Sequence, residues 1–230
     1  MAKMLMETEK VLVPDSLQET LWRLEETRQG FRTETDANIR EALRWVLARQ
    51  GLKNSYRHLF APTDRDLAQG LQLPTGERYH LRKALTRHVL GEEAIRIVIV
   101  WELKSSPSVT EALKGFDSIL ERGGNSGRYC CYTCTVSFLR TLREVKPEKW
   151  EEVLERGLSH IRKARAPDGK WHGYPFYYTL LALSEIDTSS ARAELRHASK
   201  TAEKLMRRYR ADDRISRFRR LGLEAAVNAV

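Results

Sequence analysis

Apolar side chains recur three and four residues apart along most of the chain, the spacing of helices that bury one face. Pro14, Asp15 and Ser16 are typical of a helix start, and the leucines that follow predict a first helix ending near Gly30. A second helix is predicted over about residues 36–50. We expect the two to form an outer helical hairpin.

The segment 92–104 is apolar on all sides and rich in β-branched residues, a composition that fits a buried strand as well as a buried helix. Glu92 and Glu93 after Gly91 favour the helix, because carboxylates are stabilised at a helix N-terminus. We therefore expect a buried inner helix here. Further helices are predicted over about residues 109–122, from Pro147 to Ile161, and after Pro175.

Residues 51–91 have a different pattern, since prolines and glycines break them into short pieces. We interpret them as an irregular insertion, the kind of segment that often forms a lid or a binding loop. Thr63 and Asp66 have capping-box spacing and predict a short helix. The insertion holds His58, His80 and His88, which we interpret as solvated loop residues rather than catalytic ones, with their roles left open.

A motif recurs in the second half of the chain. Gly127-Arg128-Tyr129 precedes the apolar segment 130–142, and Gly169-Lys170-Trp171, 42 residues later, precedes the apolar segment 172–183. A fixed period of this length indicates helical hairpins that bury their apolar faces against one another. A degenerate third copy is Ala48-Arg49-Gln50, followed by Tyr56.

These repeats resemble the α/α toroid of protein prenyltransferase β subunits and of squalene and terpene cyclases. Cys131-Tyr132-Thr133 is similar to the Cys-Tyr-Ser that opens an inner helix of the prenyltransferases. Residues 178–184 (Tyr-Thr-Leu-Leu-Ala-Leu-Ser) are similar to the segment that follows their catalytic histidine. The resemblance covers roughly residues 40–186. It implies an all-α fold, a toroid-like stack of helical hairpins that forms a partial ring.

The same resemblance leaves catalysis open. The prenyltransferases hold zinc with an Asp, a Cys and a His, and the matching positions here are Tyr129, Cys131 and Pro175. A zinc site needs three or four ligands, so Cys131 would have to be joined by both Cys134 and His172. We favour no metal and interpret the cysteines as small residues of a packed helix. The acidic motif of the cyclases is not matched either.

A toroid places the starts of its inner helices around a central cavity, so the resemblance implies an axial cleft lined mainly by aromatic side chains. Such a cleft suits an apolar or isoprenoid-like small molecule. The alternative is that the rings simply fill the axis. The candidate ligand-binding residues are Tyr129, Tyr132, Trp171, His172, Tyr174, Phe176 and Tyr177.

Most of the net charge lies in the C-terminal helices predicted over residues 188–220, which contain eleven Lys or Arg and four acidic residues. Their apolar stripe would dock on the ring, leaving a basic face. A second interpretation of function is therefore a helical-repeat interaction module that binds an acidic protein or nucleic acid, although a solvated face is the simpler explanation. The candidate contacts for an anionic partner are Arg207, Arg208, Arg210, Arg217, Arg219 and Arg220.

The composition, 230 residues with 41% hydrophobic, predicts one globular helical-repeat domain over residues 1–230. No apolar run approaches the ~20 residues of a membrane span, and Met1–Val13 lacks the apolar core of a signal peptide. Three cysteines, an odd number, favour a reducing, cytoplasmic location over a disulfide framework. A homodimer is left open, because an incomplete ring would leave an apolar end for a second chain to cover.

Overall fold

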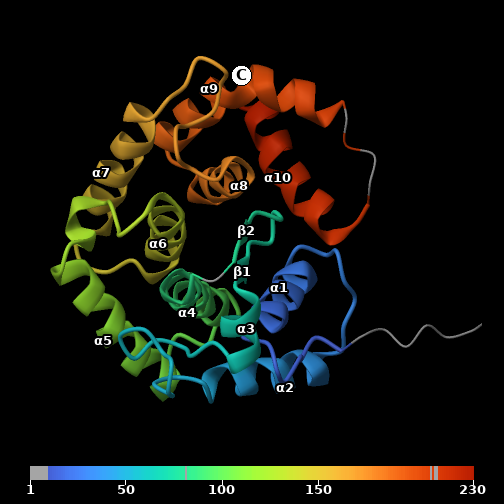
Figure 1. Ribbon diagram of the computed structural model, residues 1–230, viewed down its shortest axis with the longest axis vertical. Helices are drawn as coiled ribbons and strands as arrows, with labels where there is room; N and C mark the ends of the chain where they lie inside the picture. The colour runs from blue at the N-terminus through green and yellow to red at the C-terminus, as the bar shows by residue number, and fades with distance from the viewer. Residues whose placement is uncertain (1–9, 81, 208, 210–211) are drawn as a thin grey trace, which may run out of the picture.

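The computed structural model describes residues 10–80, 82–207, 209 and 212–230. In these residues the chain forms two concentric layers of helices (Figure 1), and the predicted all-α fold is confirmed. The inner layer consists of α1 (Leu17–Arg28), α4 (Lys83–Val100), α6 (Tyr132–Val145) and α8 (Phe176–Ile186). The outer layer consists of α2 (Asp36–Leu47), α5 (Pro107–Glu121), α7 (Trp150–Lys163) and α9 (Ser189–Met206).

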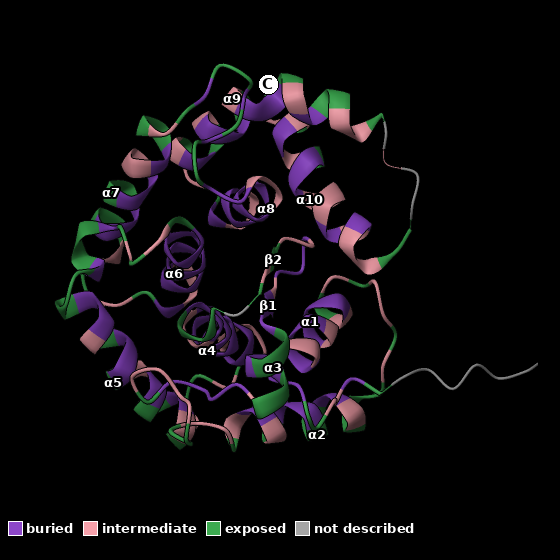
Figure 2. Cartoon of the chain, in the orientation of Figure 1, coloured by how far each residue is buried: buried purple, intermediate pink, exposed green. Residues whose placement is uncertain are grey.

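Burial follows this arrangement. The outer helices are buried where they face the inner layer and exposed on the outside (Figure 2), as their three-four apolar spacing requires. Helix α4 is buried on every side over most of its length, and each residue from Val89 to Val98 is shielded from solvent. The expectation of a helix rather than a strand in this apolar segment is therefore confirmed.

Two predicted positions need correction. Helix α4 begins at Lys83 rather than near Glu92, so Gly91 lies inside the helix and His88 lies on the helix instead of in a solvated loop. Gly91 is required for packing, because a Cβ there would lie 3.0 Å from the Cβ of Leu59. Helix α1 belongs to the inner layer, not to an outer hairpin, since its Glu25 is fully buried among the inner helices.

The insertion contains the short helix α3 (Asp64–Gln69), whose predicted capping box is confirmed, followed by the antiparallel strands β1 (Leu71–Gln72) and β2 (Arg78–Tyr79). This hairpin extends to the axis of the ring (Figure 1). Its backbone accepts a hydrogen bond from the indole of Trp22 at 3.0 Å, and Glu77 accepts one from the backbone N–H of Tyr178 at 3.2 Å. The insertion is thus packed against α1 and α8.

The sequence repeat corresponds to a repeated turn between outer and inner helices. An isolated β-bridge joins Arg165 to Trp171, and a second joins Gln50 to Phe60 in the degenerate copy. Gly127, at the start of the motif, has φ +74° and lies so close to α7 that a Cβ would be 2.2 Å from the backbone nitrogen of Gly157. Glycine is required there by both conformation and space.

Helix α10 (Arg214–Asn228) packs on α8 and α9 and reaches back to the beginning of the chain. Gly222 allows this approach, because a Cβ there would lie 2.8 Å from the Cβ of Leu180. Arg214 forms a salt bridge of 2.6 Å with Glu19 of α1. The ring of Phe218 meets that of Phe31 edge to face, with the centroids 5.6 Å apart. Helix α10 therefore connects the last hairpin to the first.

Several arginines proposed as contacts for an anionic partner have intramolecular contacts. Arg217 bonds Asp212 and the carbonyl of Phe31, whereas Arg219 bonds the carbonyl of Thr75 and lies over the ring of Tyr177. Arg220 acts electrostatically on Asp212, and Arg207 is exposed at the end of α9. Arg208 and Arg210 lie outside the described residues.

A buried ion network joins the four inner helices. Glu93 of α4 accepts hydrogen bonds from Arg96 at 2.9 Å and from Arg140 of α6 at 2.9 and 3.0 Å. Arg96 also donates to Glu25 of α1 at 2.7 Å, and Arg140 donates to Glu185 of α8 at 2.6 Å. Burial opposes ionisation, but the arginine charges outweigh it and hold the pKa values of Glu25 and Glu93 below the ordinary range.

Removing one cation from this network should destabilise the fold strongly. We expect Arg140→Met to lower the free energy of unfolding by about 3–5 kcal/mol, because it removes two of the buried hydrogen bonds to Glu93, leaving Arg96 as its remaining countercharge, and removes the two-bond partner of Glu185. Urea denaturation measures the loss. The matched control is Lys114→Met, which breaks the exposed pair with Glu111 and should change stability by about 1 kcal/mol or less. Equal effects of the two variants would contradict the prediction.

Candidate metal centre

The start of helix α6 brings three cysteines together. Cys131 is the N-cap residue, in an extended conformation, and its sulfur accepts a hydrogen bond from the backbone N–H of Cys134 at 3.3 Å. Cys130 precedes the cap and Cys134 lies in the first turn. Because residues four apart lie on the same face of a helix start, Cys130 and Cys134 can present their thiols on the same side.

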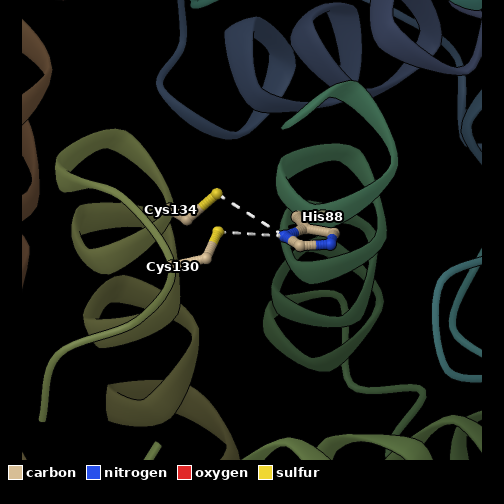
Figure 3. Close-up of side chains that lie close together, drawn as sticks. All are labelled: His88, Cys130 and Cys134. Carbon is tan, nitrogen blue, oxygen red and sulfur yellow. Dashed lines mark hydrogen bonds between the residues drawn. The ribbon is translucent and has the colours of Figure 1, made fainter. Parts of the chain in front are cut away.

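His88 of the neighbouring helix α4 faces these two thiols (Figure 3). Its Nδ1 lies 3.3 Å from the sulfur of Cys130 and 3.6 Å from that of Cys134. The three potential ligand atoms all lie within 4.8 Å of one another. Exposure increases outward, since Cys134 is buried, His88 is half-buried and Cys130 is exposed. The group therefore lies where the protein interior meets solvent.

This spacing fits one tetrahedral metal ion. With Zn–S near 2.3 Å and Zn–N near 2.0–2.1 Å, a tetrahedral site places nitrogen and sulfur ligands about 3.5 Å apart and two sulfurs about 3.8 Å apart. The observed nitrogen–sulfur separations of 3.3 and 3.6 Å need little adjustment to meet the first of these values. Imidazole and thiolate are also the donor types that zinc selects. His88, Cys130 and Cys134 could together hold a metal ion.

The ionisable groups at the start of α6 and on His88 have very different pKa values. Burial lowers the pKa of His88 to about 4, so its imidazole is neutral at pH 7, the form that binds metals. Hydrogen bonds from the thiols of Cys130 and Cys134 lower the pKa of Cys131 to about 2. The same interactions raise the pKa of Cys130 to about 11 and raise that of Cys134 as well. Metal binding at Cys130 and Cys134 must therefore displace protons.

Glu92 lies behind this cluster, one turn along α4 from His88 and on the same side of the helix. It is fully buried, and its charged form is favoured by the hydroxyl of Ser137 and disfavoured by the negative charge of Glu93. Burial raises its pKa well above the ordinary value, which favours its neutral form in the metal-free protein. Glu92 lies close enough to Cys130 and Cys134 that its negative charge would raise the pKa values of both thiols.

Two tyrosines hold the imidazole in place. The ring centroids of Tyr56 and His88 are 3.7 Å apart, those of Tyr129 and His88 are 5.5 Å apart, and the two phenol hydroxyls are hydrogen-bonded. The backbone N–H of Tyr129 in turn donates to the hydroxyl of Thr135 at 2.9 Å. His88 is thus fixed by aromatic contacts from the turn before α6 and from the insertion.

A cleft of about 430 Å³ opens onto His88 and Cys130. Tyr56 and Tyr129 form part of its wall. Its remaining charged residues are all cationic and comprise Arg57, Arg122 and Arg128. The centre is therefore accessible from solvent through a positively charged opening.

The residues predicted to bind a ligand are distributed over separate places. Tyr129 borders the cleft at His88, whereas the exposed Tyr132 packs on Tyr174, with ring centroids 4.7 Å apart. Trp171 is buried and donates its indole N–H to Glu194, and His172 is exposed in a shallow surface depression. Phe176 and Tyr177 contact each other, and Tyr177 also contacts Tyr209. Tyr129 alone among these predicted residues touches the cleft beside the cysteines.

Of the three residues considered from the sequence as metal ligands, only one belongs to this cluster. Cys134 belongs to the cluster, but Cys131 caps the helix and His172 lies on another surface. Sequence reasoning missed Cys130 and His88 as ligands. The i, i+4 spacing of Cys130 and Cys134 was visible, but His88 had been placed in a loop because the start of α4 was assigned too late.

The chain matches no known family model, no curated protein and no solved structure. In the part of the chain that the structure describes, no helix has both the length and the apolar character needed to cross a bilayer.

Because the pKa of Glu92 is raised, we expect this residue to make the stability of the metal-free protein depend on pH. Above about pH 4.5 the unfolded chain ionises Glu92 while the folded, metal-free chain resists it, so this residue costs stability increasingly as the pH rises. We expect Glu92→Gln to raise the unfolding temperature of the metal-free protein at pH 8 and to have little effect at pH 4. The exposed Glu224→Gln is the control and should show no such difference. A pH-independent effect of Glu92→Gln would contradict the assignment.

Proposed function

We propose that this protein binds one zinc ion through Nδ1 of His88 and the sulfurs of Cys130 and Cys134, at the inner end of an open cleft. The observation that carries the proposal is the convergence of these three atoms, from two neighbouring inner helices, at separations close to those of a tetrahedral site. Two cysteines and a histidine that lay near one another by chance would have no reason to adopt the ligand separations of a tetrahedral site.

Two further features support zinc. The neutral state of His88 leaves a lone pair for the metal without the cost of deprotonation. The negative charge favoured on Cys131, next to both ligand thiols, would stabilise a dication without binding it. The ligand set differs from the one the prenyltransferase resemblance implies, because Cys130 and Cys134 replace Cys131.

The other interpretations stay predictions. An apolar or isoprenoid-like ligand would have to bind beside the hairpin β1–β2, which extends to the axis. An acidic protein or nucleic acid could contact the exposed Arg207, whereas Arg217 and Arg219 of α10 already have partners within the chain. A homodimer and a cytoplasmic location also stay predictions. Kinship with the prenyltransferases and cyclases rests on the motifs around Cys131 and residues 178–184 alone.

The test is the zinc content of protein purified without chelators. We expect one zinc per chain by native mass spectrometry, and Cys130→Ser, Cys134→Ser and His88→Ala should each lower zinc affinity by more than about 10- to 100-fold, the loss caused even by residues that only support metal ligands. Circular dichroism checks that each variant remains folded.

Cys131→Ser is the matched control. Serine is a good N-cap residue, so this variant should keep helix α6 and still bind one zinc, with a smaller loss of affinity than the ligand variants because it removes only a nearby negative charge. Loss of zinc from Cys131→Ser together with retention in Cys130→Ser would overturn the proposed ligand set. Wild-type protein that takes up no zinc would overturn the proposed function itself.

A further inference from the structure

The cleft in front of the cluster is lined by cations that have no countercharge. Arg57, Arg122 and Arg128 all border it, and no acidic residue is among the described residues that form its wall. None of the three arginines forms a salt bridge with another described residue. Arg192 is also exposed, but it pairs with Asp187 at 2.8 Å. Like charges that converge without a countercharge repel one another, and an anion entering the cleft relieves that repulsion.

The backbone fixes Arg57 in this wall. Its φ of +51° lies in the left-handed region, which residues other than glycine rarely adopt. Its carbonyl is packed against α5 at Gly115, where a Cβ would lie 2.0 Å from the carbonyl oxygen. The guanidinium lies 5.8 Å from the ring of Tyr56, whose centroid is 3.7 Å from that of His88. Strained backbone that is held in place by packing is typical of ligand-binding positions.

The other two arginines border one turn. Arg122 is the C-cap residue of α5, and Arg128 follows the short 3-10 helix η1 (Gly124–Ser126). The hydroxyl of Ser126 accepts a hydrogen bond from the backbone N–H of Arg128 at 3.2 Å. Arg156 of α7 donates to a carbonyl of the same turn at 2.8 Å. The wall of the cleft is thus fixed before a ligand arrives, which lowers the cost of binding.

The zinc site leaves a position for such an anion. Tetrahedral zinc takes four ligands, and the mutually close group among the described residues supplies three. The cleft of about 430 Å³ reaches His88 and Cys130, two of the three. A small molecule in the cleft can therefore lie beside the open position. Because two thiolates already balance the charge of the zinc, the three arginine charges remain to be neutralised, and a dianion neutralises more of them than a monoanion.

We propose that the cleft binds a small dianion, a molecule that carries a phosphate group or two carboxylates. One of its oxygens occupies the fourth position of the zinc, and the others meet Arg57, Arg122 and Arg128. The inference rests on the zinc function proposed above. The planar guanidinium group matches the oxygens of both phosphate and carboxylate with paired hydrogen bonds, which gives the ligand its chemical class.

The test is isothermal titration calorimetry of the zinc-loaded full chain with inorganic phosphate and, separately, with succinate. We expect one dianion to bind per chain, with an affinity that falls as salt is added, because salt screens charges that are open to solvent. Acetate, which has a single carboxylate, should bind at least about 10-fold more weakly. Binding of phosphate alone assigns a phosphate-bearing ligand, and binding of succinate alone assigns a dicarboxylate.

Three variants test the wall. Arg57→Asn, Arg122→Gln and Arg128→Gln should each weaken binding of the dianion by about 10-fold, the loss expected for one hydrogen bond to a charged group. Asparagine replaces Arg57 because it tolerates the left-handed conformation. The matched control is Arg40→Gln, which removes an exposed charge from α2 and should leave the affinity unchanged. Circular dichroism checks that each variant is folded.

Co²⁺ in place of zinc tests contact with the metal, because its visible absorption reports its coordination. The bound dianion should change that absorption with the midpoint found by calorimetry.

The inference is overturned if neither phosphate nor succinate binds at millimolar concentration, or if acetate binds as tightly as they do. It is also overturned if the three variants bind like the wild type, if Arg40→Gln weakens binding as much as they do, or if the Co²⁺ absorption does not respond. Failure to bind zinc is a different result, because it removes the proposed function, whereas titration of the metal-free chain with phosphate still tests the three arginines.

Discussion

The buried pairing of Glu93 with Arg96 and Arg140 is the constraint on which the rest of the ring depends. Charges this deep in a protein are costly unless they are paired and hydrogen-bonded, and here the geometry succeeds only when helices from both ends of the chain are in place. Arg96 needs Glu25 of α1, and Arg140 needs Glu185 of α8. The network therefore rewards one specific arrangement of the inner helices, whereas leucine and valine contacts would tolerate several.

The same pairing sets the register of α4 against α6, and hence the geometry of the metal centre. Helix α4 carries both Glu93 and His88, and α6 carries both Arg140 and Cys134. The hydroxyl of Thr141 also donates to the carbonyl of Glu92 at 3.1 Å. A slip of one helical turn would separate His88 from the thiols by about 5.4 Å, far more than a metal site tolerates. The ion network of Glu93 and Arg140 thus fixes the relative position of α4 and α6, and with it the distances between His88 and the two thiols.

Much of the fold follows from the sequence, because three-four spacing and caps are local signals. The helical state of the apolar segment from Glu92 to Val100, the capping box at Thr63 and the repeated turn before α8 could all be predicted. The cluster of His88, Cys130 and Cys134 could not, because its members come from two helices and their meeting depends on tertiary register. The late start assigned to α4 hid His88, since Gly91 reads as a helix boundary unless its close approach to Leu59 is known.

The repeat period by itself would also mislead about the site. His88, Cys130 and His172 are separated by 42 residues each, yet they do not occupy equivalent positions. His88 lies in the second turn of α4, Cys130 precedes the cap of α6, and His172 lies in the turn before α8. Helix α8 begins only after Pro175, so His172 remains exposed in that turn. Within the described residues, the cluster forms between α4 and α6. Helix α4 begins at Lys83, before His88, and therefore brings this histidine beside the start of α6.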